Sequence, residues 1–274
     1  MKLLPVLVAK ALTDNGYDLI SAPDDGWFVA GISGSPASVL IQVVEEGILL
    51  ALPEADTVER IGLETSGQVP PAGMVSVGLA RGATHIFEAL RVLHSLLLHP
   101  VAVLSSKVES RLAAIPQTER TREVRQRIGQ DVFREALMDL WQGRCAVTGM
   151  VLPRQLLRAS HCKPWSQASH SERLDPFNGL LLSVHLDAMF DTGLMSFSDE
   201  GVLLCSRHLD ASVRVHFSIV AGQRLRFLNP GHIPYLAWHR EHLFEGKGGG
   251  ECEDATRAAN LPRDGMCRPL ARTP

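Results

Sequence analysis

Three short apolar runs near the start of the chain, each bounded by turn-forming residues, constrain the fold most. They are GWFVAGIS (26–33), SVLIQVVEE (38–46) and GILLALP (47–53). Short runs rich in Val, Ile and aromatic residues, divided by Gly, Pro, Asp and Ser, are typical of an antiparallel meander. We expect GMVSVGLA (73–80) to add another strand. The runs therefore predict a small sheet in the first third of the chain.

Along the chain, one helix is expected before the strands of this sheet and another after them. Residues 1–18 carry apolar side chains at helical spacing, and Gly16 is a natural end for the helix. Residues 83–98 place Ile86, Leu90, Leu93 and Leu97 on one face. We therefore predict that residues 1–104 form a small α+β domain. Its role is not readable from the sequence, and a recognition or regulatory module is one candidate.

The second half of the chain begins with a more polar segment. Residues 105–130 are rich in arginine, and we place the linker there. A helix is expected over GQDVFREALMDLW (129–141), leading into a domain that spans residues 105–245. The tail, residues 246–274, has few large apolar side chains and many Gly, Pro and charged residues, so we expect it to be disordered.

Bulk properties limit the location and partners of the protein. The five cysteines contain no C-x-x-C pair, which disfavours a disulfide framework and favours a cytoplasmic location. The most apolar stretch, residues 90–104, is broken by Arg91, His94, His99 and Pro100, so we expect no membrane span. The net charge is −3, so any contact with nucleic acid needs a local basic surface.

Polar residues with regular spacing mark the second domain. His161 follows LPRQLLRAS, which is compatible with the end of a strand, and Asn178 lies 17 residues further on. Asp187 and Asp191 are separated by four residues, so on a helix both would point the same way. A histidine can accept a proton near neutral pH, and carboxylates bind hard cations such as Mg²⁺. This combination suits the hydrolysis of a phosphodiester.

Three segments resemble the HNH endonuclease family, in particular the branch that accompanies bacterial restriction-type endonucleases. They are RCAVTGM (144–150), LLRASHCKPW (156–165) and RLDPFNGLLLSVHLDAMFDTGLMSF (173–197), and the resemblance extends over residues 120–244. It implies a ββα-metal fold, also called a His-Me finger, wrapped around one divalent ion. The chain as a whole is then expected to be α+β, with the small N-terminal domain followed by the nuclease domain.

The resemblance also implies roles for single residues. His161 matches the general base that activates water, and Asn178 matches the residue that holds the loop carrying this base. Asp187 matches the last motif residue, a metal ligand. Asp191 lies one turn later, where some members have a further ligand.

The sequence departs from the family at the metal ligands. Relatives often have a metal-binding Asp or His before the general base, where this chain has Ser160. We take His185 as the candidate for the missing ligand. Only Cys145 stands near the positions of a structural zinc site, and Ser183 stands where a cysteine would be, so a structural zinc is doubtful. The carboxylate-rich ligand set favours Mg²⁺ or Mn²⁺.

Arginine and lysine side chains around the motif are candidates for contact with DNA. Arg127, Arg144, Arg158 and Lys163 are the predicted DNA-binding residues, and Arg134 and Arg154 add to the local positive charge. A solvated surface with no ligand is the competing interpretation for each of them.

These observations predict a two-domain, metal-dependent DNA endonuclease. A role in restriction or phage defence is implied by the resemblance alone. One alternative is a degenerate HNH module that binds nucleic acid without cutting it. Another is a nuclease gated by a ligand or protein bound to the N-terminal domain. The sequence leaves open the target, the choice between DNA and RNA, nicking against double-strand cleavage, and the oligomeric state, for which a homodimer would suit paired cuts.

Overall fold

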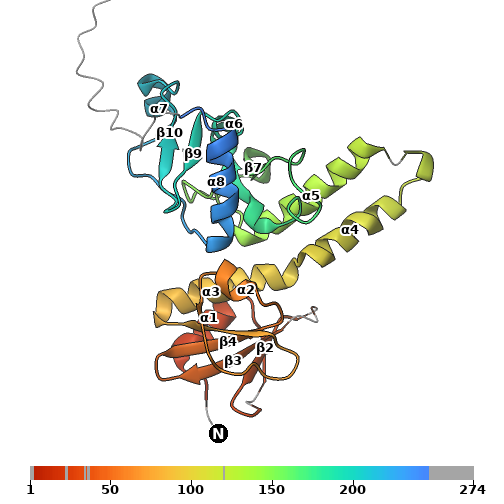
Figure 1. The fold of residues 1–274 in the computed structure, drawn as a ribbon, viewed down its shortest axis with the longest axis vertical. Helices are drawn as coiled ribbons and strands as arrows, with labels where there is room; N and C mark the ends of the chain where they lie inside the picture. Colours follow the sequence, from red (N-terminus) through yellow and green to blue (C-terminus); the bar gives the residue numbers. More distant parts are fainter. Residues whose placement is uncertain (1–2, 22–23, 34, 36–37, 120, 247–274) are drawn as a thin grey trace, which may run out of the picture.

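The computed structural model describes residues 3–21, 24–33, 35, 38–119 and 121–246, which form two lobes joined by long helices (Figure 1). Apart from Gly246, the tail expected to be disordered lies outside the described residues. The mixture of helix and sheet confirms the expected α+β class.

The N-terminal lobe is an antiparallel sheet with helices against one face. Its strands, in spatial order, are β1 (Leu19–Ile20), β2 (Phe28–Gly31), β3 (Ser38–Val44), β4 (Gly47–Leu52), β6 (Ser76–Ala80) and β5 (Glu64–Thr65). Its helices are α1 (Val6–Asp14), α2 (Thr57–Arg60) and α3 (Gly82–Leu98). The four apolar runs identified in the sequence are therefore confirmed as β2, β3, β4 and β6.

The two faces of this sheet bury different side chains because strand residues alternate between faces. Ile41 and Leu50 belong to the main core, together with apolar residues of α1 and α3 such as Leu12 and Leu90. A second, smaller cluster covers the other face, and it consists of Trp27, Leu49, Ala51, Val77 and Leu79.

The expected linker is helical rather than extended. Helices α4 (Val101–Ala113) and α5 (Arg122–Leu140) pack against each other, with the short 3₁₀ turn η1 (Gln117–Glu119) between them. Leu104, Val108 and Leu112 are buried at intervals of four residues, so one face of α4 is part of the core. The polar composition arises on the other faces, where Arg111 pairs with Glu135 at 2.9 Å. The boundary placed between residues 104 and 105 falls inside α4.

Helices α3 and α4 are also the most apolar segment. Taken together as Gly82–Ala113, they are long and apolar enough to span a membrane by length and composition alone, a test that core helices also satisfy. In the 18-residue stretch of this segment with the highest mean hydropathy, 44% of the residues are buried inside the protein. The helical conformation is interrupted between α3 and α4, at His99 and Pro100.

The C-terminal lobe contains the ββα unit that the resemblance implied. Strand β7 (Leu157–His161) pairs antiparallel with β8 (Gly179–Ser183), and α6 (Val184–Asp191) follows β8 directly. Two short 3₁₀ turns precede these strands, η2 (Arg154–Leu156) and η3 (Pro176–Asn178). The rest of the lobe consists of β9 (Met195–Phe197), β10 (Leu203–Cys205), α7 (Ala211–His216), η4 (Pro230–His232) and α8 (Ile233–His242).

Gly179 allows the hairpin to lie close to α5. It is extended rather than turned, as the first residue of β8. A Cβ atom at this position would lie 2.4 Å from Cζ of Phe133 and 2.7 Å from Cδ1 of Leu137. The glycine after Asn178 is therefore required by packing rather than by a turn.

The cysteines are not all thiols. Cys145 and Cys162 are free and buried, whereas Cys205 is disulfide-bonded.

Candidate active site

A pair of carboxylates lies where helix α6 packs against strand β7. Ser160 and Cys162 alternate with His161, so both face α6. The Ser160 hydroxyl donates a hydrogen bond to Oδ1 of Asp187, and Asp191 follows one helical turn later on the same face. Cys162 is buried beside them, and its burial and the charge of Asp191 raise the pKa of its thiol. The structure thus brings Asp187 and Asp191 together, as their spacing predicted.

The two carboxylates repel each other. Partial desolvation and the charge of Asp187 raise the pKa of Asp191 to about 6. Such a shift is the expected response of a partly buried carboxylate with a like charge nearby. The pair therefore has a net attraction for positive charge.

Arginine side chains lie next to this acidic pair. Burial, and then the charges of Arg154 and Arg158, lower the pKa of Arg134, while Asp131 and then Asp187 act in the opposite direction. Arg134 is therefore close enough to each of these charged groups to interact with it. Arg134 is anchored to the backbone, donating to the carbonyl of Leu157 at 2.8 Å and to that of Arg154. Arg154 and Arg158 are exposed and can meet a phosphate.

His161 faces the other way, toward α5. Its ring stacks on Phe133 with 3.8 Å between ring centroids, and it meets Trp165 edge-on at 5.9 Å. The Nε2–H group donates to the carbonyl of Arg173 at 3.0 Å, which leaves Nδ1 as the nitrogen that can accept a proton. Burial lowers the pKa of His161 to about 4, so the ring is neutral at pH 7.

The imidazole and the acidic pair therefore lie on opposite faces of β7. Ser160 and His161 are consecutive strand residues, and consecutive side chains of a strand point to opposite sides. The sequence led us to expect one cluster of base and ligands. The structure instead places them at the same strand end but on two faces.

Asn178 ties down the loop that follows His161. Its side chain is fully buried. Oδ1 accepts a hydrogen bond from the Lys163 amide at 2.8 Å, and Nδ2 donates to the carbonyls of Lys163 and Glu172 at 3.1 and 2.9 Å. All three bonds hold the two ends of one loop together, which is the arrangement that the resemblance implied for this residue.

His185 does not join Asp187 and Asp191. Residues two apart on a helix point in different directions, and the ring of His185 stacks on Phe217 at 5.0 Å. It also lines a separate cavity of about 240 Å³ beside Thr148 and Met150. Over the described part of the chain, no three His, Cys, Asp or Glu side chains are grouped closely enough to hold a metal ion. The predicted set of three ligands is therefore not assembled.

The donors that are present suit some metals better than others. Mg²⁺ keeps several waters and binds through one or two carboxylates together with substrate phosphate, which Asp187 and Asp191 can provide. A structural zinc needs four nitrogen or sulfur ligands. Cys145 instead contacts the Ser183 hydroxyl, with the sulfur and oxygen 3.9 Å apart. The residues present therefore fit Mg²⁺ or Mn²⁺ and do not fit a structural zinc.

The predicted DNA-binding residues occupy different environments. Arg158 lies near Arg134, which in turn interacts with Asp187, whereas Lys163 is held by Glu172 at 2.8 Å. Arg144 bonds the carbonyl of Gly149 at 3.3 Å, and Arg127 is exposed on α5. Arg134 and Arg154, which the sequence offered only as part of a general positive charge, are the residues that the fold groups with Arg158.

The strand hairpin, the helix with its two carboxylates and the histidine at the strand end form one ββα unit. Residues 145–198, roughly a fifth of the chain, match the family model for HNH endonucleases, which confirms the resemblance for this segment of the C-terminal half. The match supports nuclease activity in general and a nucleic acid as substrate. A comparison of the chain with curated proteins finds no match.

Proposed function

We propose that the C-terminal lobe is a metal-dependent DNA endonuclease. The observation that carries this proposal is the adjacent pair Asp187 and Asp191, with Arg134 near Asp187, on the ββα unit of an HNH segment. A site of this kind can hold a divalent cation and the phosphodiester backbone at once.

Each side chain has a distinct task in this proposal. Asp187 and Asp191 would hold Mg²⁺ or Mn²⁺, which when bound supplies electrostatic stabilisation of the charged phosphate. Arg154 and Arg158 bind phosphate oxygens. His161 accepts the proton of the attacking water at Nδ1, because Nε2 is engaged by the Arg173 carbonyl. This scheme requires a phosphate bound at the end of β7, where side chains from both faces of the strand could reach it.

The second candidate is a module that binds nucleic acid without cutting it. Two observations favour it: within the described residues no third ligand joins the acidic pair, and His161 lies on the opposite face of β7. The basic residues beside the acidic pair would serve binding in either case.

Cleavage of supercoiled plasmid distinguishes the two candidates. We expect wild-type protein to cut with Mg²⁺ or Mn²⁺ and not with EDTA, and His161→Ala and Asp187→Asn to lose about a hundredfold or more in rate. His170→Ala is the matched control, because His170 is an exposed histidine of the same loop. Binding of DNA without cutting in either metal would instead favour the second candidate, and a labelled RNA duplex in parallel tests the choice of substrate.

Cytoplasmic action in restriction or phage defence is part of the same proposal, supported by the resemblance alone. Cells that express wild-type protein should then reduce phage plating relative to cells that express His161→Ala. Equal plating efficiency with both proteins, over a panel of phages with modified and unmodified DNA, would exclude this role.

A further inference from the structure

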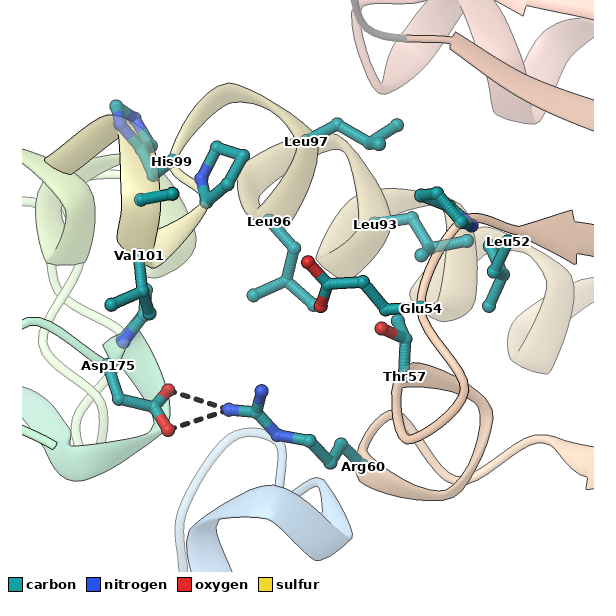
Figure 2. A pocket seen from close by; sticks show the side chains of 14 residues that line it. Leu52, Glu54, Thr57, Arg60, Leu93, Leu96, Leu97, His99, Val101 and Asp175 are labelled. Carbon is teal, nitrogen blue, oxygen red and sulfur yellow. Dashed lines mark hydrogen bonds and ion pairs between the residues drawn. The ribbon is translucent and has the colours of Figure 1, made fainter. Parts of the chain in front are cut away.

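Arg60, at the end of α2 in the N-terminal lobe, binds a residue next to the candidate active site. Its Nη2 group lies 2.8 and 2.7 Å from the two carboxylate oxygens of Asp175 (Figure 2). Its guanidinium carbon also lies 4.8 Å from the centre of the Phe177 ring. One arginine of the first lobe therefore contacts two of the three residues that precede Asn178.

Asp175 organises the turn that carries Asn178. Its Oδ1 atom accepts a hydrogen bond from the Phe177 amide at 3.0 Å, which caps η3. Its Oδ2 atom accepts a hydrogen bond from the Tyr235 hydroxyl at 2.9 Å. The Asp175 side chain is only 12% exposed, so loss of Arg60 would leave a nearly buried carboxylate without its cation.

A continuous set of contacts leads from this turn to His161. Asn178, the last residue of η3, holds the loop at Lys163 and Glu172. Arg173 follows Glu172, and its carbonyl accepts the Nε2–H hydrogen bond of His161. The orientation of the imidazole therefore depends on the position of η3.

We infer that Arg60 is a positioning residue for His161, and thus that the N-terminal lobe is a working part of the nuclease site. The inference rests on the proposed function, because it concerns the geometry of the proposed base. Arg60 touches neither substrate nor metal in this scheme. It acts by holding Asp175 and Phe177, and through them the loop that fixes the imidazole.

The surroundings of Arg60 allow a direct test by chemical rescue. Arg60 and Asp175 line two cavities, one of about 150 Å³ that includes Leu96 and Val101, and one of about 370 Å³ that includes Tyr235. Figure 2 shows the first, with the guanidinium at one end of it. Truncation of Arg60 would therefore leave a site that a small guanidinium ion can enter from solvent.

The first measurement is plasmid cleavage by Arg60→Ala. We expect kcat to fall by about tenfold to a hundredfold, with KM within about twofold of wild type, since orientation and not binding is lost. Millimolar ethylguanidinium should restore part of kcat in Arg60→Ala and none in Asp175→Asn. Arg111→Ala is the matched control, because Arg111 makes a similar pair with Glu135 that is more exposed, at 42% and 38%.

The second measurement does not depend on cleavage. In ¹⁵N-histidine NMR spectra of the full chain, wild-type His161 should be the Nε2–H tautomer with a protected proton. We expect Arg60→Ala to lose this signal and ethylguanidinium to restore it. His239, whose two ring nitrogens lie 2.9 Å from Ser196 Oγ and 3.0 Å from the Phe190 carbonyl, is the internal control and should not change.

The two measurements separate failure of this inference from failure of the proposed function. If wild type does not cut but the His161 signal depends on Arg60, the nuclease proposal fails and the positioning role stands. Wild-type kcat and an unchanged His161 signal in Arg60→Ala would overturn the positioning role. If Arg60→Ala does not fold, Arg60→Gln, which removes the positive charge but keeps most of the side chain, serves instead. Unchanged kcat and an unchanged His161 signal in that variant would overturn the positioning role.

Discussion

The Ser160 hydroxyl donates a hydrogen bond to Asp187, joining the end of strand β7 to the first turn of helix α6. Ser160 thus occupies the position from which a third ligand would reach the acidic pair. We expect Ser160→Asp to lower stability in EDTA by about 1 kcal/mol, through repulsion of like charges, and to increase the stabilisation produced by Mn²⁺. Thermal denaturation with and without Mn²⁺ measures both effects.

The control for this substitution is Ser166→Asp, which adds the same charge at an exposed loop position. If Mn²⁺ raises the melting temperature of both variants equally, the metal does not bind at Asp187 and Asp191.

Asp191 should make the protein less stable as pH rises. Its pKa is raised from 3.8 to about 6 in the folded chain, so ionisation is harder in the folded than in the unfolded state. Its contribution to stability is full below pH 4 and is lost as pH rises through about 6. We therefore expect Asp191→Asn to be more stable than wild type at pH 8, by on the order of 1 kcal/mol after discounting for its exposure.

Urea denaturation in EDTA at pH 5 and pH 8 measures this difference. Glu241→Gln, which removes an exposed carboxylate of α8, should show no such change between the two pH values. A stability difference for Asp191→Asn that is the same at both pH values would contradict the repulsion between the two aspartates.

Buried histidines should make the C-terminal lobe sensitive to acid. Burial lowers the pKa of His161 and His239 to about 4 and that of His232 to about 3. Below pH 6.5 these histidines bind protons in the unfolded chain but stay neutral in the folded chain. The free energy of unfolding therefore falls as the pH drops from 6.5 toward 4. The loss is on the order of 3 kcal/mol for each fully buried ring.

His239→Gln tests this assignment, because a glutamine cannot take up the proton. The variant should be less stable than wild type at pH 7, while its stability should fall less between pH 6.5 and 4. If the stability of this variant falls as steeply with decreasing pH as that of wild type, His239 does not titrate in this range. His170→Gln, at an exposed position, is the control and should leave the slope unchanged.

Arg154 and Arg158 should contact the phosphate backbone. We expect Arg158→Ala, and separately Arg154→Ala, to weaken DNA binding and to reduce the slope of log K against log salt by about 1 each. Fluorescence anisotropy over a salt series, with EDTA present to prevent cutting, provides the slope. Arg122→Ala removes a charge about 18 Å along α5 from Arg134 and should change the slope less.

Gly179 should not tolerate a side chain. In Gly179→Ala the new Cβ would overlap Phe133, so we expect a destabilisation of about 1–3 kcal/mol as the hairpin moves away from α5. Gly67→Ala is the control, since a Cβ there meets nothing within 4 Å. Urea denaturation compares the two variants. Equal stability would show that α5 and β8 are packed less closely than the distances from Gly179 to Phe133 and Leu137 indicate.

Local patterns in the sequence predicted much of the fold. The strands of the first lobe and the helices over residues 83–98 and 129–141 follow from periodicity, which is a property of neighbouring residues. Helix α4 and the first part of α5 were missed because their exposed faces are rich in charge, and in α4 only Leu104, Val108 and Leu112 indicate the buried face. The HNH motifs also lie close together in the sequence, so the resemblance to that family does not depend on knowledge of the fold.

The sequence alone determined the motif and the spacing of Asp187 and Asp191, and it indicated the class of chemistry that is proposed here. Only the tertiary structure decided which face each side chain takes: it turned His161 away from the acidic pair and His185 toward Phe217. It also joined Arg60 to Asp175, 115 residues apart in the chain. The physical reason is that strand and helix periods send close neighbours to different faces, while contacts across lobes depend on how whole elements pack.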